Sequence, residues 1–253
     1  MEIIKLPRLE RIVFHKKGCN NIIKQMIAPE FDLPLNIEET SRSYVTINYL
    51  DAKYCLTCNK ETYPQDITYV LLTDTRPTKE KLASCSVCIK CWLKHPLLKE
   101  YSTKEVVQSW KNDFFFKEED QNNNGLRLPQ IGALHMILGH LKMPLETATV
   151  VLPTGTGKTE TMLSALVANQ CERLLVTVPS NSLRNQIFDK FESFGLLKSF
   201  GVIGEKSLYP IVGIIKEKFE TSDLLKSFLA QCNVIVTTMQ IVTGCSDEEQ
   251  NLF

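Results

Sequence analysis

The residues most directly suited to chemistry form one short loop. Residues 153–160 read Pro-Thr-Gly-Thr-Gly-Lys-Thr-Glu, directly after the apolar run 149–152 and before a helix-like stretch. Gly155 and Gly157 let the backbone turn tightly and bring its N–H groups close to phosphate oxygens, and the start of the helix adds its positive dipole end. A strand, a glycine loop and a helix in this order predict a binding site for nucleotide phosphates.

Two side chains of this loop carry the ligand chemistry. The Lys158 ammonium can reach the β and γ phosphates of a triphosphate, and the Thr159 hydroxyl suits the Mg²⁺ ion that bridges them. We therefore assign catalytic roles to Lys158 and Thr159. The strict loop pattern has a further glycine at its start, which this chain lacks. We expect these residues to contact the nucleotide: Thr154, Gly155, Thr156, Gly157, Lys158, Thr159 and Glu160.

The cysteines form a second pattern, since five of the nine lie between residues 55 and 91. Cys55 and Cys58 make one Cys-x-x-Cys pair, Cys85 and Cys88 make another, and 26 residues separate the pairs. Two such pairs can complete a tetrahedral shell of four thiolates around a structural Zn²⁺ ion. Cys91 is an alternative ligand to Cys85, because Cys88 and Cys91 have the same spacing.

The composition is that of a folded globular protein. A chain of 253 residues has room for two compact domains, and 43% apolar with 23% charged residues argues against disorder. Lys plus Arg and Asp plus Glu both total 29, so any nucleic-acid surface must be local. The charged N-terminus does not read as a signal peptide, and no apolar run of about 18 residues occurs. We expect no membrane association and a cytoplasmic location.

Residues 117–125 mark the clearest break along the chain, because polar and turn-forming residues replace all apolar periodicity there. We expect an N-terminal domain at 1–122, with the zinc module at about 53–95, and a second domain at 123–253. Strands alternate with helices after the break, beginning with a strand at 147–152. The predicted fold is α/β, a parallel sheet with flanking helices preceded by a small zinc-binding α+β domain.

Several segments after the break resemble superfamily two (DEAD/DEAH-type) helicases and translocases, particularly the motor subunits of restriction enzymes. The loop at 153–159 resembles helicase motif I, which tolerates other residues at the first loop position. Upstream, the run 126–130 resembles an Arg-x-x-Gln element that reads adenine. The resemblance implies a RecA-like domain of the P-loop NTPase class, in which Gln130 selects ATP with support from Arg127. A restriction or defence role follows from the same resemblance.

Two further segments, 178–186 and 236–240, resemble family elements that contact the nucleic-acid backbone. The resemblance implies nucleic-acid contacts by Ser180, Arg184, Thr237 and Thr238. Ser180 is equally suited to cap a helix, and Arg184 equally suits a solvated helix face, so both alternatives stay open. DNA is the expected partner, with RNA as the alternative.

A catalytic acidic strand is not evident in the sequence. Helicases need a strand that ends in Asp-Glu, whose carboxylates hold Mg²⁺ and position the attacking water. The acidic run 247–249 follows a segment too short and polar for a central strand, so we interpret it as an acidic helix or loop surface rather than a degenerate motif. The first motor domain thus reads as truncated before the acidic motif.

The sequence therefore predicts the ATP-binding motor portion of a helicase or translocase. We expect nucleic-acid-stimulated ATP hydrolysis only with the acidic motif and a second motor domain, which a second polypeptide could supply. This chain alone is expected to be deficient in hydrolysis. The alternative is a catalytically inactive nucleic-acid-binding or scaffold protein that uses nucleotide binding as a switch.

Overall fold

The computed structural model describes residues 2–16, 18–143 and 147–253. The chain forms two compact units, and it passes between them more than once. The smaller unit contains residues 1–10 and 27–100, and the larger unit contains residues 11–26 and 101–253. Residues 101–122 thus pack with the segment that follows them, while the expected domain boundary at 122 and 123 stays a prediction.

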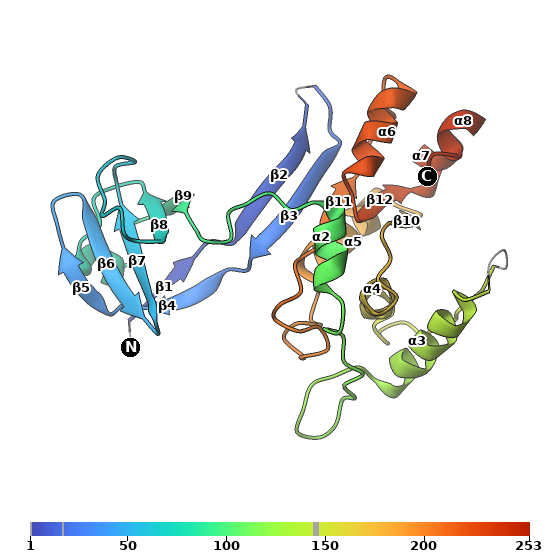
Figure 1. Ribbon diagram of the computed structural model, residues 1–253, viewed down its shortest axis with the longest axis horizontal. Coiled ribbons are helices and arrows are strands. Elements are labelled where there is room, and N and C mark those ends of the chain that lie inside the picture. The colour runs from blue at the N-terminus through green and yellow to red at the C-terminus, as the bar shows by residue number, and fades with distance from the viewer. Residues whose placement is uncertain (1, 17, 144–146) are drawn as a thin grey trace. The chain divides into compact units, whose positions relative to one another are not determined.

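The smaller unit is built mainly of strands (Figure 1). Its five-stranded sheet has the order β5-β6-β7-β8-β9, in which only β7 and β8 run parallel, and β1 pairs with β4 in a separate antiparallel ribbon. Its elements are β1 (Ile3–Leu6), β4 (Phe31–Pro34), β5 (Ile37–Thr40), β6 (Tyr44–Tyr49), β7 (Ala52–Thr57), β8 (Tyr69–Thr73), α1 (Lys79–Ala83) and β9 (Ile89–Lys94).

The larger unit is an α/β fold around a five-stranded sheet of order β10-β12-β11-β3-β2 (Figure 1). The strands β10, β12 and β11 run parallel, as the alternation of strands and helices predicted. Most of β2 (Leu9–His15) and β3 (Ile22–Ala28) belongs to this unit, namely residues 11–15 and 22–26. Its other elements are α2 (Thr103–Ser109), α3 (Leu128–His140), α4 (Lys158–Ala168), β10 (Leu174–Val178), α5 (Asn181–Ser193), β11 (Ile211–Ile214), α6 (Ser222–Ala230), β12 (Val234–Thr238), α7 (Met239–Thr243) and α8 (Asp247–Gln250).

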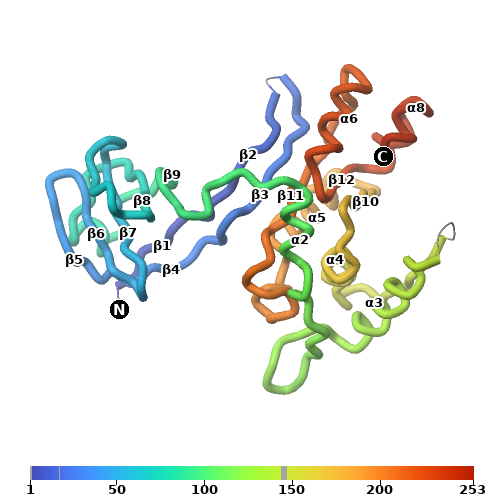
Figure 2. Tube along the Cα trace, viewed as in Figure 1, coloured from blue at the N-terminus to red at the C-terminus, as the bar shows by residue number. Residues whose placement is uncertain are grey.

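An N-terminal hairpin completes the sheet of the larger unit. The strand β3 pairs antiparallel with β11, from Ile211 opposite Gln25 to Ile214 opposite Ile22, and the trace of both strands can be followed in Figure 2. Next to this pairing, the fully buried Asn21 accepts hydrogen bonds on Oδ1 from the backbone N–H groups of Lys216 and Glu217, at 2.7 and 3.1 Å. Residues near the start of the chain thus cover the edge of β11.

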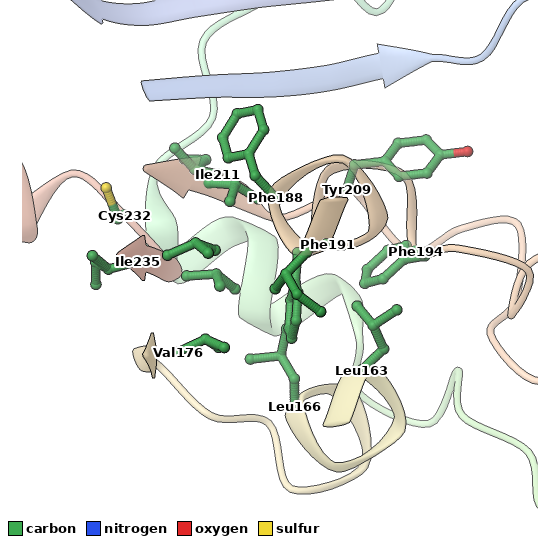
Figure 3. Packing of buried hydrophobic residues seen from close by; sticks show 14 of the residues in the cluster. Leu163, Leu166, Val176, Phe188, Phe191, Phe194, Tyr209, Ile211, Cys232 and Ile235 are labelled. Atoms are coloured by element: carbon green, nitrogen blue, oxygen red, sulfur yellow. The ribbon is translucent and has the colours of Figure 1, made fainter. Parts of the chain in front are cut away.

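The helix α5 shows how the local sequence sets the core. The Ser180 side chain caps its first turn by accepting from the N–H of Leu183 at 3.3 Å, and Phe194 ends it in the left-handed conformation. Its apolar face places Phe191 and Phe194 against Leu163 and Leu166 of α4 (Figure 3). Burying each large apolar side chain contributes about 1.5–3 kcal/mol, so this face, not helix propensity, holds α5 in place.

The strand expected at 147–152 is not formed, which corrects the sequence-based prediction. No strand is assigned over these six residues, and the side chains of Val150 and Val151 are 40% and 85% exposed. A strand needs a neighbour for its backbone groups, and apolar β-branched residues alone do not supply one.

The acidic run 247–249 lies in a short helix, as one of its two sequence readings proposed. Ser246 and Glu249 form a reciprocal capping box at the start of α8, so the carboxylates stabilise a helix terminus. Across the part of the chain that the structure describes, every helix is too short or too polar to traverse a lipid bilayer.

Candidate nucleotide-binding site

The predicted phosphate loop ends where α4 begins. Gly157 caps this helix with φ at 82°, in the left-handed region that favours glycine. A Cβ atom at Gly157 would also collide with the side-chain Nε2 of Gln130. Two independent constraints therefore require glycine here, the backbone angle and the close approach of a neighbouring side chain.

The loop folds around the carbonyl oxygen of Pro153. The Lys158 ammonium donates to this oxygen at 2.9 Å, and the Thr156 hydroxyl donates to it at 2.6 Å. An ammonium has three donors, so the exposed Lys158 keeps two for another acceptor. Thr154 is also exposed, and Thr159 is half-buried directly after Lys158. The loop thus presents a cation and hydroxyl groups to solvent at the start of a helix, which suits a phosphate ligand.

The Arg-x-x-Gln element lies against this loop. The sequence alone does not show that these two segments are close. Arg127 Nη1 donates to the carbonyl oxygen of Gly155 at 2.8 Å, and Gln130 Nε2 donates to that of Gly157 at 3.0 Å. Gln130 Oε1 also accepts from the backbone N–H of Arg127 at 2.8 Å. The 5% exposed Gln130 side chain thus joins the start of α3 to the loop.

Two charged side chains that sequence reasoning did not identify pair with residues of the site. Glu119 accepts from Arg127 Nε at 3.2 Å, and Lys190 of α5 binds Glu160 Oε1 at 2.9 Å. Both partners were outside the expected site. Lys190 is thirty positions from Glu160. Neither pair has a local sequence signal, because each depends on the packing of separate elements.

The residues expected to contact nucleic acid gather at the carboxyl ends of the parallel strands. Thr237 and Thr238 end β12, Thr238 lies opposite Val178 of β10, and Ser180 follows β10. Ser180 caps α5, so the capping alternative is correct, while its hydroxyl remains exposed at the helix start. Thr237 is fully buried and its hydroxyl donates to the carbonyl oxygen of Ile215 at 3.2 Å.

Arg184 does not lie on a solvated helix face, as one sequence interpretation proposed, because its side chain is 5% exposed. Its Nη1 donates to the same Ile215 carbonyl oxygen at 3.4 Å, and burial lowers the pKa of the guanidinium from its ordinary value. The residue is therefore no solvated helix arginine. In this conformation it contacts the strand end, and a contact with nucleic acid stays a prediction.

The structure does not group the cysteines as the expected zinc shell, so the four-thiolate prediction is not supported. Within residues 2–16, 18–143 and 147–253, no three His, Cys, Asp or Glu side chains are grouped as metal ligands. Cys55 is fully buried in β7 beside Ile67 and Val70, and burial raises the pKa of its thiol to about 12.

The other expected zinc ligands lie in different surroundings. Cys58 Sγ lies 3.4 Å from the carbonyl oxygen of Ser43, while three thiols are exposed: Cys85, Cys88 and Cys91. Cys85 and Cys88 line a cavity of about 490 Å³ in the smaller unit, which Cys55 and Cys58 do not line. The two Cys-x-x-Cys pairs therefore belong to separate local structures.

The α/β sheet, the loop at the start of α4 and the attached Arg-x-x-Gln element define a helicase-like motor domain of the superfamily two type. Residues 123–253 match the family described as Type III restriction enzyme, res subunit, and the chain belongs to this family. The family implies ATP and Mg²⁺ as ligands. Neither the curated proteins nor the solved structures contain a match to this chain.

Proposed function

We propose that this protein binds ATP with Mg²⁺ at the loop 153–160 and binds DNA at the carboxyl ends of β10 and β12. The observation that carries this proposal is the attachment of Arg127 and Gln130 to the carbonyl oxygens of Gly155 and Gly157. It holds an adenine-reading element beside a phosphate-binding loop. RNA is the alternative nucleic acid.

The loop residues supply the contacts to the triphosphate. Lys158 would neutralise phosphate oxygens with the donors that Pro153 leaves available, and the Thr159 hydroxyl would hold Mg²⁺. The bound metal would supply charge neutralisation between the phosphates. Gly155 and Gly157 keep the loop backbone free of Cβ atoms on the ligand side.

Adenine selection would use the hydrogen-bonding groups of the Gln130 side-chain amide that the loop contacts leave available. One side-chain N–H of Gln130 donates to the Gly157 carbonyl oxygen, and the side-chain oxygen of Gln130 accepts once from the backbone N–H of Arg127. One N–H and one lone pair stay available, which is the pair of groups that the N7 and N6 edge of adenine requires. The proposal therefore predicts that ATP binds more tightly than GTP.

Hydrolysis requires more than these residues supply. Among the described parallel strands, β10 is followed by Pro179 and Ser180, β11 by Ile215 and Lys216, and β12 by Met239 and Gln240, so no Asp-Glu pair directly follows any of the three. Phosphoryl transfer needs such carboxylates and the cations of a second motor domain. We propose that these residues bind ATP but turn it over only when a second polypeptide or further sequence contributes those groups.

Nucleotide binding by titration calorimetry tests the proposal. Lys158→Ala should weaken ATP binding at least about tenfold, because a charge-assisted contact to phosphate is lost. The matched control is Lys226→Ala, which removes an exposed lysine of α6 and should leave the dissociation constant unchanged. Equal ATP affinity in the wild type and in Lys158→Ala would contradict the proposal.

The second candidate is a nucleotide-switched scaffold without motor activity. The lack of an Asp-Glu pair at the ends of β10 and β12 favours it. The two functions share ATP binding and differ in turnover, so ATP hydrolysis measured with DNA and with candidate partner polypeptides separates them. Stimulated hydrolysis supports the motor, and ATP binding without hydrolysis under all of these conditions supports the switch.

A further inference from the structure

An ion pair connects the first turn of α4 to α5. Glu160 Oε1 lies 2.9 Å from the Lys190 ammonium, and the two side chains are only 14% and 36% exposed, respectively. Water and salt screen a partly buried pair less than a surface pair, so this contact constrains the two helices more than an exposed one would. The pair also places a carboxylate at the positive end of α4.

The Glu160 carboxylate lies between the phosphate loop and the end of α5. A Cβ atom at Gly157 would be 3.4 Å from Glu160 Oε2, and a Cβ atom at Gly195 would be 3.5 Å from Oε1. Glu160 is therefore close to both Gly157 and Gly195, and its Oε1 binds Lys190. A shift of the loop on ligand binding would displace this carboxylate and change its contact with α5.

Buried side chains of α4 pack against those at the end of α5. Leu163 and Leu166 of α4 belong to the same buried cluster as Phe191 of α5 and Phe194 at its end. Figure 3 shows Phe191 and Phe194 beside Leu163 and Leu166. Closely packed elements transmit displacement because their interiors have few voids.

The opposite end of α5 carries Ser180, which is proposed to meet nucleic acid, and Arg184, which contacts the end of the neighbouring strand. Ser180 caps its first turn, and Arg184 contacts the Ile215 carbonyl oxygen that Thr237 also contacts. The helix runs from Asn181 to Ser193, so Lys190 is near its end and Ser180 is at its start. One rigid element thus links the ion pair to the proposed DNA contacts.

We propose that Glu160 and Lys190 are a positioning pair that couples nucleotide occupancy of the loop to DNA affinity at the start of α5. The inference rests on the proposed function, because it requires both ligands to bind. Nucleotide phosphates at Gly157 and Lys158 act on the neighbouring Glu160 carboxylate, and Lys190 transfers the displacement to α5. The effect is reciprocal, so DNA changes nucleotide affinity by the same factor as nucleotide changes DNA affinity.

Fluorescence anisotropy of a labelled DNA oligonucleotide, with and without a nonhydrolysable ATP analogue, tests the coupling. In the wild type the analogue should change the DNA dissociation constant by about fivefold or more. In Lys190→Met this factor should fall toward one, while binding of each ligand alone persists. Lys190→Arg keeps the charge and should retain the coupling.

A double-mutant cycle separates the pair from general destabilisation. Glu160→Gln should remove the coupling as Lys190→Met does, and the double variant should be no worse than either single one. The matched control is Lys16→Met, which breaks the exposed pair with Glu220, whose side chains are 47% and 78% exposed, and should leave the coupling unchanged.

The possible outcomes distinguish this inference from the proposed function. If the wild type binds both ligands but shows no coupling, or if folded Lys190→Met and Glu160→Gln variants keep it, the inference is overturned and the proposed function remains. If the wild type binds no nucleotide or no DNA, the proposed function fails and the inference fails with it.

Discussion

The side-chain Nε2 of Gln130 donates to the carbonyl oxygen of Gly157 at 3.0 Å. This contact joins the first turn of α3 to the residue that caps α4, so an element implicated in adenine recognition also fixes the shape of the phosphate loop. Glycine at position 157 allows this contact, because a Cβ atom there would occupy the position of the Gln130 amide. The two functions of the site therefore depend on each other.

Gln130→Ala should weaken both stability and nucleotide selection. The variant leaves the Gly157 carbonyl and the Arg127 N–H without this partner, and loss of such a hydrogen bond costs about 1 kcal/mol or more. The preference for ATP over GTP should fall. Urea denaturation and competition between the two nucleotides measure these effects, with Gln108→Ala on the exposed face of α2 as the control. An unchanged ATP preference would remove the adenine role from Gln130.

Gly157→Ala should destabilise the loop and abolish nucleotide binding. The left-handed backbone alone costs an alanine about 1–2 kcal/mol, and the collision with Gln130 adds to it. Gly132→Ala is the matched control, because nothing lies within 4 Å of a Cβ at Gly132 in the middle of α3. That control should stabilise the helix by about 0.5–1 kcal/mol. Normal binding by Gly157→Ala would exclude the proposed loop geometry.

Asn21→Ala should destabilise the larger unit although residue 21 precedes the family match. Asn21 makes hydrogen bonds to the N–H groups of Lys216 and Glu217, and its Nδ2 donates to the Glu217 carbonyl at 3.0 Å. Losing three such bonds should cost about 2–3 kcal/mol. Hydrogen exchange of β11 and β12 amides measures the change. Asn124→Ala, in an exposed loop, should leave exchange unaltered, and equal protection in both variants would refute the stabilising role of the hairpin.

Cys55 should resist alkylation under conditions in which exposed cysteines react. Burial raises the pKa of its thiol to about 12, so the reactive thiolate is scarce at pH 8. Mass spectrometry after iodoacetamide treatment should find Cys85, Cys88 and Cys91 modified first, since these thiols are exposed. Rapid modification of Cys55 in the folded protein would show that β7 is less protected than described.

The raised pKa of the Cys55 thiol also predicts a loss of folding stability at alkaline pH. Because the folded-state pKa of Cys55 is raised from about 9 to about 12, the folded state holds its proton more tightly than the unfolded state. The stability that this group contributes is complete below pH 9 and is lost as pH rises toward 12. Urea midpoints measured across this range for wild type and Cys55→Ala should converge at high pH, and parallel curves would contradict the shift.

The sequence by itself determined the features that depend on local chemistry. The order of glycines, lysine and threonine in 153–159 predicted a loop at a helix start, and α4 begins at Lys158. The alternation of strands with helices after the break at 117–125 predicted a parallel sheet, and β10, β11 and β12 form one. Capping was one of two alternatives that the sequence left open for Ser180, and its hydroxyl does accept from a backbone N–H three residues on.

Only the tertiary structure decided features that join distant residues. Apolar content predicted a strand at 147–152, but strand formation depends on a neighbouring edge that composition cannot specify. Cysteine spacing predicted a metal shell, yet the pleat of β7 buries Cys55 while Cys85 and Cys88 line a separate cavity. The Glu160–Lys190 pair and the hairpin on β11 likewise arise from packing between separate elements, and no short-range pattern encodes which of these surfaces will meet.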